Sequence, residues 1–126
     1  MYLFVYGTLM RGYGNNVLLS EARFLGVASV KGSLYGFGVP GFDPVPKGKG
    51  IVFGELYEVE EGPVLERIDA LEGHPHHYIR ERVSCTLHTG AKDEAEVYVY
   101  PRASKHGEFI PSGRYQDYRK PHNSQE

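Results

Sequence analysis

The chain has 126 residues and a formal net charge of −2. This length fits one domain with a real core, and the balanced charge supplies no basic field that would favour nucleic acid as a partner. Cys85 is the only cysteine in the sequence, which excludes an internal disulfide and favours a reducing, cytoplasmic location. The apolar run after Met1 is too short for a signal peptide or a membrane span, so no membrane partner is expected.

The strands are predicted from short runs rich in aromatic and β-branched residues. They fall in five segments: 3–6, 22–34 (one or two strands, interrupted near Gly26 and Gly32), 51–59, 77–87 and 94–100. Between the second and third segments, residues 36–46 are so rich in glycine and proline that we expect an ordered loop without regular structure.

One helix is predicted among these strands. Pro63 suits its first turn, where a missing N–H costs nothing, and Gly73 suits its end. Strands outnumber helices, so the sequence predicts an α+β domain on a small, highly curved sheet or barrel with mainly antiparallel pairing. We expect this single domain to cover residues 1–118 and to be followed by a polar C-terminal tail, 119–126.

Glu72 is an acid at an apolar position of this helix. Val64, Leu65, Ile68 and Leu71 follow the spacing of one buried stripe, and at about 100° per residue Glu72 falls inside it. Burial and the negative end of the helix dipole both disfavour a carboxylate, which predicts a raised pKa suited to a general base. The alternatives are that Glu72 reaches water at the helix edge, or that it forms an ion pair with Arg80 or Arg82.

The segment Tyr6-Gly7-Thr8-Leu9 leaves the first predicted strand through a glycine. Backbone N–H groups that leave a sheet in this way can form a small nest for a carboxylate or an oxyanion. The alternative is a plain turn between a strand and a loop. Thr8 would act as a nucleophile only beside a base, which the sequence does not show.

Other candidates are weaker. His74, His76 and His77 resemble a metal cluster, but Pro75 breaks the helical spacing of a zinc site, so no metal is expected. Cys85 has apolar alternate neighbours and is expected in the core. The segment 48–50 lacks the rest of a phosphate-binding loop and is expected to be a turn.

Four segments occur in an informative order. They are Val5-Tyr6-Gly7-Thr8-Leu9; Phe37-Gly38-Val39-Pro40-Gly41-Phe42; Ile68-Asp69-Ala70-Leu71-Glu72-Gly73 followed by Tyr78-Ile79-Arg80; and Ile110-Pro111-Ser112-Gly113-Arg114-Tyr115. Together they resemble the gamma-glutamylcyclotransferase-like family, including its gamma-glutamylamine cyclotransferase branch. The resemblance runs from about residue 3 to about residue 118. The histidine-rich stretch before Tyr78 departs from the family pattern.

The resemblance implies a small mixed or antiparallel β-barrel flanked by short helices. It implies an enzyme that cyclises a gamma-glutamyl amine or peptide to 5-oxoproline and releases the amine, without a cofactor or metal. In this reading Glu72 is the catalytic acid and base, and the substrate contacts are Tyr6, Gly7, Thr8, Leu9, Tyr78, Arg80 and Tyr115. A non-catalytic binding module and an inert structural barrel remain alternatives. The leaving amine, the oligomeric state and the role of the histidines stay open.

Overall fold

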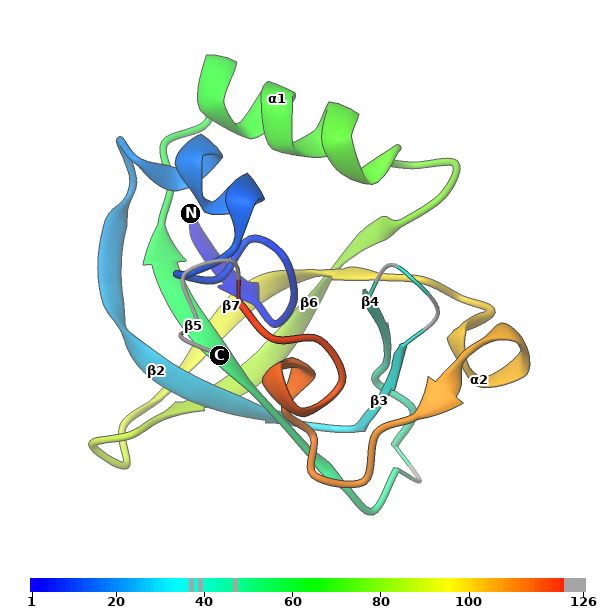
Figure 1. The fold of residues 1–126 in the computed structure, drawn as a ribbon. Coiled ribbons are helices and arrows are strands. Elements are labelled where there is room, and N and C mark those ends of the chain that lie inside the picture. Colours follow the sequence, from blue (N-terminus) through cyan, green and yellow to red (C-terminus); the bar gives the residue numbers. More distant parts are fainter. Residues whose placement is uncertain (37, 39, 47, 122–126) are drawn as a thin grey trace.

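The computed structural model describes residues 1–36, 38, 40–46 and 48–121. In this part of the chain, five strands close into a barrel in the order β1-β5-β2-β6-β7. Their bounds are Tyr2–Val5 (β1), Arg23–Lys31 (β2), Ile51–Glu58 (β5), Ile79–Leu87 (β6) and Lys92–Val99 (β7). Figure 1 shows the barrel with α1 across one end. The predicted α+β class with a small mixed barrel is confirmed.

The barrel is mixed because its closing pair is parallel. The β1 strand pairs with β5 in the antiparallel sense, with Phe4 opposite Leu56, and with β7 in the parallel sense, with Phe4 opposite Val97. A strand that is paired on both sides and enclosed needs apolar residues on both faces, and Leu3, Phe4 and Val5 are all buried. This arrangement fixes the end of β1, where the candidate loop begins.

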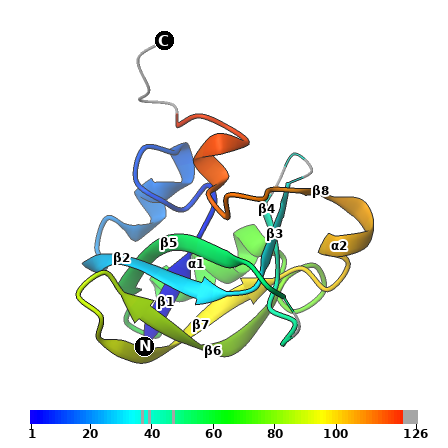
Figure 2. The same ribbon diagram turned by 90° about the horizontal axis from the view of Figure 1, so that it is seen from below.

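A second, three-stranded sheet packs beside the barrel in the order β4-β3-β8 (Figure 2). Its strands are Ser33–Gly36 (β3), Pro40–Asp43 (β4) and Glu108–Phe109 (β8). The expectation that residues 36–46 lack regular structure is therefore wrong for β4. Proline is tolerated there because Pro40 is the first residue of an edge strand. Residues 37, 39 and 47 of this region lie outside the described residues.

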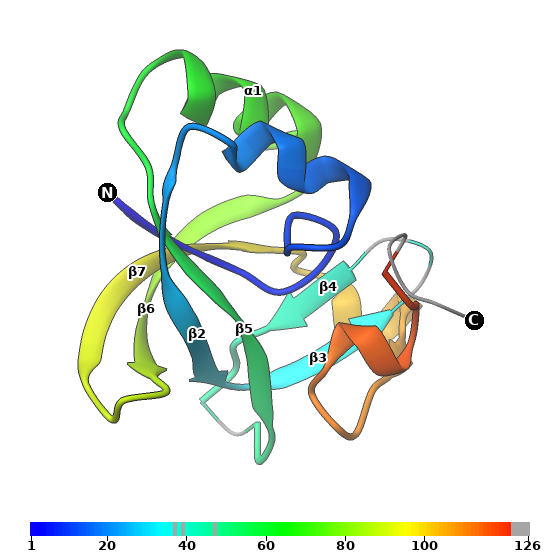
Figure 3. The ribbon, with the colours of Figure 1, turned by 60° about the vertical axis from the view of Figure 1, so that its left-hand side comes forward.

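The helices are short and lie outside the barrel. Their bounds are Gly14–Leu19 (η1, a 3-10 helix), Pro63–Glu72 (α1), Ala103–His106 (α2) and Tyr115–Asp117 (η2, a 3-10 helix). Figure 3 shows α1 and η1 side by side at one end of the barrel. The predicted helix is confirmed as α1, whereas the other three were not predicted. No helix among the described residues is long and apolar enough to cross a membrane. Of the expected tail, residues 122–126 lie outside the described residues.

Candidate active site

Glu72 is the last residue of α1. The helix ends there because Gly73 adopts a left-handed conformation, with φ of 68°, and its N–H donates to the carbonyl of Ala70. Leu65 and Ile68 are buried as the stripe predicts, but Leu71 is 45% exposed, so the expectation for that residue is wrong. The face of α1 turned toward the barrel therefore carries Leu65, Ile68 and the partly buried Glu72.

The structure brings Glu72 and the loop after β1 to one narrow pocket. Its free space is about 10 Å³, close to the volume needed by one water molecule. The pocket is lined by Phe4, Val5, Tyr6, Gly7, Thr8, Leu9, Pro40, Glu72, Tyr78 and Tyr98. Thus a helix end, a strand end and an edge strand of the second sheet, which are distant in sequence, meet around one carboxylate.

Burial raises the pKa of Glu72 to about 7. Within the described part of the chain, its carboxylate has no hydrogen-bond or ion-pair partner. The two arginines that were considered as partners pair elsewhere: Arg80 with Asp69 and Glu96, and Arg82 with Glu96. A carboxyl group that titrates near neutral pH and has no partner is suited to accept and return a proton.

Three tyrosines, Tyr6, Tyr78 and Tyr98, line the pocket together with Glu72. The Tyr6 hydroxyl donates to the backbone carbonyl of Tyr98 at 2.5 Å. The hydroxyls of Tyr78 and Tyr115 are buried and have no hydrogen-bond partner. Burial, and next the nearby Glu72, raise the pKa of Tyr78 well above its ordinary value, so this phenol stays protonated at neutral pH. Buried polar groups are usually paired, and an unpaired phenol beside a pocket is available to a ligand.

The loop after β1 is held in place by hydrogen bonds to its backbone carbonyl oxygens. Met10 N–H donates to the Gly7 carbonyl at 3.0 Å, and the Asn16 amide donates to the Leu9 carbonyl at 2.7 Å. The backbone N–H groups of Thr8 and Leu9 find no acceptor among the described residues. A rigid loop with free N–H groups beside a pocket can bind an oxyanion or a carboxylate.

Gly7 is required by close packing. A Cβ atom at this position would lie 2.3 Å from Cγ of Pro40, far inside van der Waals contact. Pro40 thus closes the pocket directly over the loop.

A family model described as gamma-glutamyl cyclotransferase, AIG2-like, matches residues 3–117. The chain belongs to this family. It is 40% identical over 121 residues to the "Putative gamma-glutamylcyclotransferase" of Methanocaldococcus jannaschii, covering 94% of this chain and 98% of that protein. It is 37% identical over 106 residues to the gamma-L-glutamyl-butirosin B gamma-glutamyl cyclotransferase of Niallia circulans, covering 79% and 67% respectively.

Solved structures agree with this assignment. The crystal structure of an AIG2-like protein from Mus musculus superposes with a TM-score of 0.73 at 29% identity, covering 88% of this chain and 86% of that one. An uncharacterized protein from Pyrococcus horikoshii superposes with a TM-score of 0.71 at 30% identity, covering 94% and 92%. The AIG2-like fold therefore extends over nearly the whole chain.

Two expected substrate contacts, Arg80 and Tyr115, do not line the pocket of this AIG2-like protein. Arg80 does not line the pocket; its Nε donates to Asp69 Oδ1 at 2.9 Å, and the same carboxylate accepts the Tyr98 hydroxyl at 2.5 Å. This network fastens the end of α1 to β6 and β7. Tyr115 is fully buried, and its ring packs against Tyr13. Tyr98 and Pro40 line the pocket but were not expected as site residues. Pro40 belongs to one of the four segments that carry the family resemblance, whereas nothing in the local sequence of Tyr98 distinguishes it from a core residue.

The histidines lie in the turn between α1 and β6. His74 Nδ1 accepts the backbone N–H of Arg80 at 3.2 Å, while His76 and His77 are exposed. In the described part of this AIG2-like chain, no group of three or more histidine, cysteine, aspartate or glutamate side chains is arranged to hold a metal ion. Cys85 is buried in the core, as expected.

Proposed function

We propose that the chain is a gamma-glutamylcyclotransferase in which Glu72 transfers the protons. The observation that carries this proposal is the partnerless Glu72 carboxyl, with a pKa raised to about 7, in the same pocket as the Tyr6–Leu9 loop. Family membership and the names of the relatives support gamma-glutamylcyclotransferase activity.

The substrate brings its own nucleophile. The α-amine of a gamma-glutamyl compound attacks the side-chain amide carbonyl, a bond forms between this nitrogen and the carbonyl carbon, and the bond from that carbon to the leaving nitrogen breaks. The products are the five-membered lactam 5-oxoproline and a free amine. Because the nucleophile is already tethered, the protein gains most by holding the reactive conformer.

Proton balance defines the task of Glu72. The substrate ammonium loses one proton before attack and a second as the lactam forms, and the leaving nitrogen gains one. The second released proton passes to water or to the freed amine. A carboxyl group titrating near 7 can take the first proton and deliver one to the leaving nitrogen, which contributes about 10²–10⁴-fold in rate.

The remaining groups suit the developing charge. The free N–H groups of Thr8 and Leu9 can bind a substrate carboxylate or the oxyanion of the tetrahedral intermediate. The unpaired Tyr78 hydroxyl, kept protonated, is a further donor. The Tyr115 hydroxyl is unpaired as well and raises the pKa of Tyr78, so we assign it to the same polar cluster. We propose that Arg80 positions the end of α1, which carries Glu72, through its bond to Asp69.

The test is release of 5-oxoproline from a panel of gamma-glutamyl compounds with different leaving amines: a free amino acid, a polyamine, a lysine side chain and an aminoglycoside. The last is included because the Niallia circulans relative is named for gamma-L-glutamyl-butirosin B. We expect release from at least one compound. Saturable binding of these compounds without any 5-oxoproline would instead identify a binding module.

A further inference from the structure

Glu55 is a second buried glutamate, outside the pocket of Glu72. It lies in β5, is 6% exposed, and is the one charged residue among the described residues that is fully buried. Burying a carboxylate is costly unless it is paired and hydrogen-bonded. Its position therefore needs an explanation that the proposed chemistry does not provide.

The Glu55 carboxylate is fully occupied by partners. Oε1 accepts the backbone N–H of Arg11 at 3.0 Å and the Tyr57 hydroxyl at 3.0 Å, and Oε2 accepts Arg11 Nε at 3.3 Å. Charge-assisted hydrogen bonds of this kind are stronger than neutral ones. Glu55 therefore differs from Glu72, whose carboxylate has no partner within the described chain.

These partners lead to the loop after β1. Arg11 follows the loop directly, so the bond to its backbone N–H fixes where the loop ends. Tyr57 accepts the Asn16 amide at 3.1 Å, and the same amide donates to the Leu9 carbonyl at 2.7 Å. The Glu55 carboxylate thus holds the segment Gly7–Arg11 directly at Arg11 and, through Tyr57 and Asn16, indirectly at Leu9.

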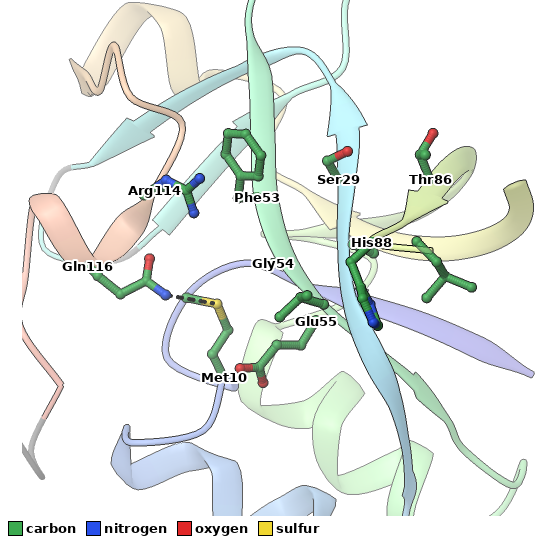
Figure 4. A pocket seen from close by; sticks show the side chains of 12 residues that line it. Met10, Ser29, Phe53, Gly54, Glu55, Thr86, His88, Arg114 and Gln116 are labelled. Carbon is green, nitrogen blue, oxygen red and sulfur yellow. Dashed lines mark hydrogen bonds between the residues drawn. The ribbon is translucent and has the colours of Figure 1, made fainter. Parts of the chain in front are cut away.

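Figure 4 shows the Glu55 side chain leaving β5 toward Met10. On this side a groove of about 320 Å³ runs along the outside of the barrel, lined in part by Met10, Glu55 and Gln116. Leu9 and Met10 are buried in the hydrophobic core, so packing holds part of the loop, and the groove adjoins it on the side of Glu55. The hydrogen bonds of Glu55 add to this packing on the side of the groove.

We propose that Glu55 is a positioning residue that holds the Gly7–Arg11 segment so that the N–H groups of Thr8 and Leu9 face the ligand. The catalytic part of this inference rests on the proposed function, whereas the effect on loop conformation does not. Misplacing a substrate-binding group by about 1 Å can reduce turnover by up to about 100-fold.

The test compares Glu55→Gln with Glu58→Gln. Both change a glutamate of β5 to glutamine, but Glu58 is partly exposed and pairs with Arg23, away from the loop. In Glu55→Gln, an amide N–H₂ faces a donor of Arg11. We expect kcat/KM to fall by about tenfold or more, mainly through KM, with the acid limb of the pH profile still near 7. We expect Glu58→Gln to match the wild type.

Amide hydrogen exchange tests the positioning of the loop without an activity measurement. In Glu55→Gln we expect the Met10 amide, which is bonded to Gly7, to exchange about tenfold faster or more, while the barrel amides of β1 and β5 keep wild-type rates. If all amides accelerate together, the role of Glu55 is only structural and the inference is wrong. If Met10 and kcat/KM are both unchanged, while Glu72→Gln is inactive, the inference fails and the proposed function stands. If the wild type releases no 5-oxoproline, the proposed function fails and the Met10 exchange rate still decides the inference.

Discussion

The Glu72 carboxylate and the Tyr78 hydroxyl line one narrow pocket, and neither has a hydrogen-bond partner in the described chain. The two groups influence each other electrostatically, because the charge of Glu72 raises the pKa of Tyr78 beyond the effect of burial. A folded protein gains nothing from leaving two buried polar groups unpaired. In the proposed function, the substrate pairs with both.

The first prediction concerns Tyr78→Phe. Removing a buried hydroxyl that has no partner leaves the ring packing intact, so the melting temperature should stay the same or rise. Turnover should fall by about tenfold if the hydroxyl donates to the substrate. Tyr35→Phe, in β3 away from the pocket, is the control. A lower melting temperature with unchanged turnover in Tyr78→Phe would argue against this role.

The pH dependence of activity follows from the raised pKa of Glu72. Only the ionised carboxylate accepts the ammonium proton, so kcat/KM should fall as the pH drops below about 7. In Glu72→Gln, any residual activity should lack this inflection. A profile that stays flat down to pH 5 would contradict the assignment.

Stability should depend on pH through the same group. The folded protein holds the Glu72 proton up to about pH 7, whereas an ordinary glutamate loses it near 4.5. The stabilisation associated with this proton is complete below about pH 4.5 and is lost as the pH rises through about 7. The free energy of unfolding of Glu72→Gln minus that of the wild type should therefore be larger at pH 8 than at pH 4.5. Urea titrations at the two pH values measure this difference.

The close approach of Gly7 and Pro40 predicts that a substitution at Gly7 destabilises the protein and that a second substitution at Pro40 restores part of the lost stability. In Gly7→Ala the new methyl group meets the Pro40 ring, so the ring or the loop must shift. We expect stability to fall by about 1–3 kcal/mol and turnover to fall with it. Adding Pro40→Gly removes the colliding atoms. The double variant should therefore lose less stability than the sum of the losses in Gly7→Ala and Pro40→Gly. Additive effects in the double variant would show that the two sites do not interact.

Asp69 should hold the end of α1 in place. Its carboxylate accepts Arg80 and the Tyr98 hydroxyl, so Asp69→Ala removes the acceptor of that hydroxyl and leaves Arg80 paired with Glu96 alone. We expect a loss of about 1–3 kcal/mol in the free energy of unfolding, against less than about 0.5 kcal/mol for the exposed Glu66→Ala on the same helix. Equal losses in the two variants, measured by urea titration, would contradict this role.

The sequence predicts best where local chemistry decides the structure. Pro63 and Gly73 bound α1 because helix ends have local requirements, and the strand predicted at 3–6 is found one residue earlier as β1, because a strand enclosed on both sides must be apolar. The strand at Pro40–Asp43 was missed because it depends on pairing with β3, which outweighs the glycine and proline content.

The candidate site was predictable only in part for the same reason. Glu72 is visible as an acid at an apolar helix position, but the exposure of Leu71 depends on how α1 rests on the barrel. Glu55 escaped notice because an acid on the outer face of a strand is usually solvated. The aromatic Phe53 and Tyr57 on either side of it, at alternate positions, were the signal that this outer face is covered.

Glu72→Gln separates proton transfer by Glu72 from a structural role of the same residue. Glutamine keeps the shape of the side chain but cannot accept the ammonium proton. Release of 5-oxoproline and the melting temperature should be measured at pH 8 on the same samples of wild type and variant. We expect a folded variant, at least as stable as the wild type, whose turnover is lower by about 10²-fold or more. Turnover near the wild-type level in the folded variant would show that Glu72 does not transfer the protons.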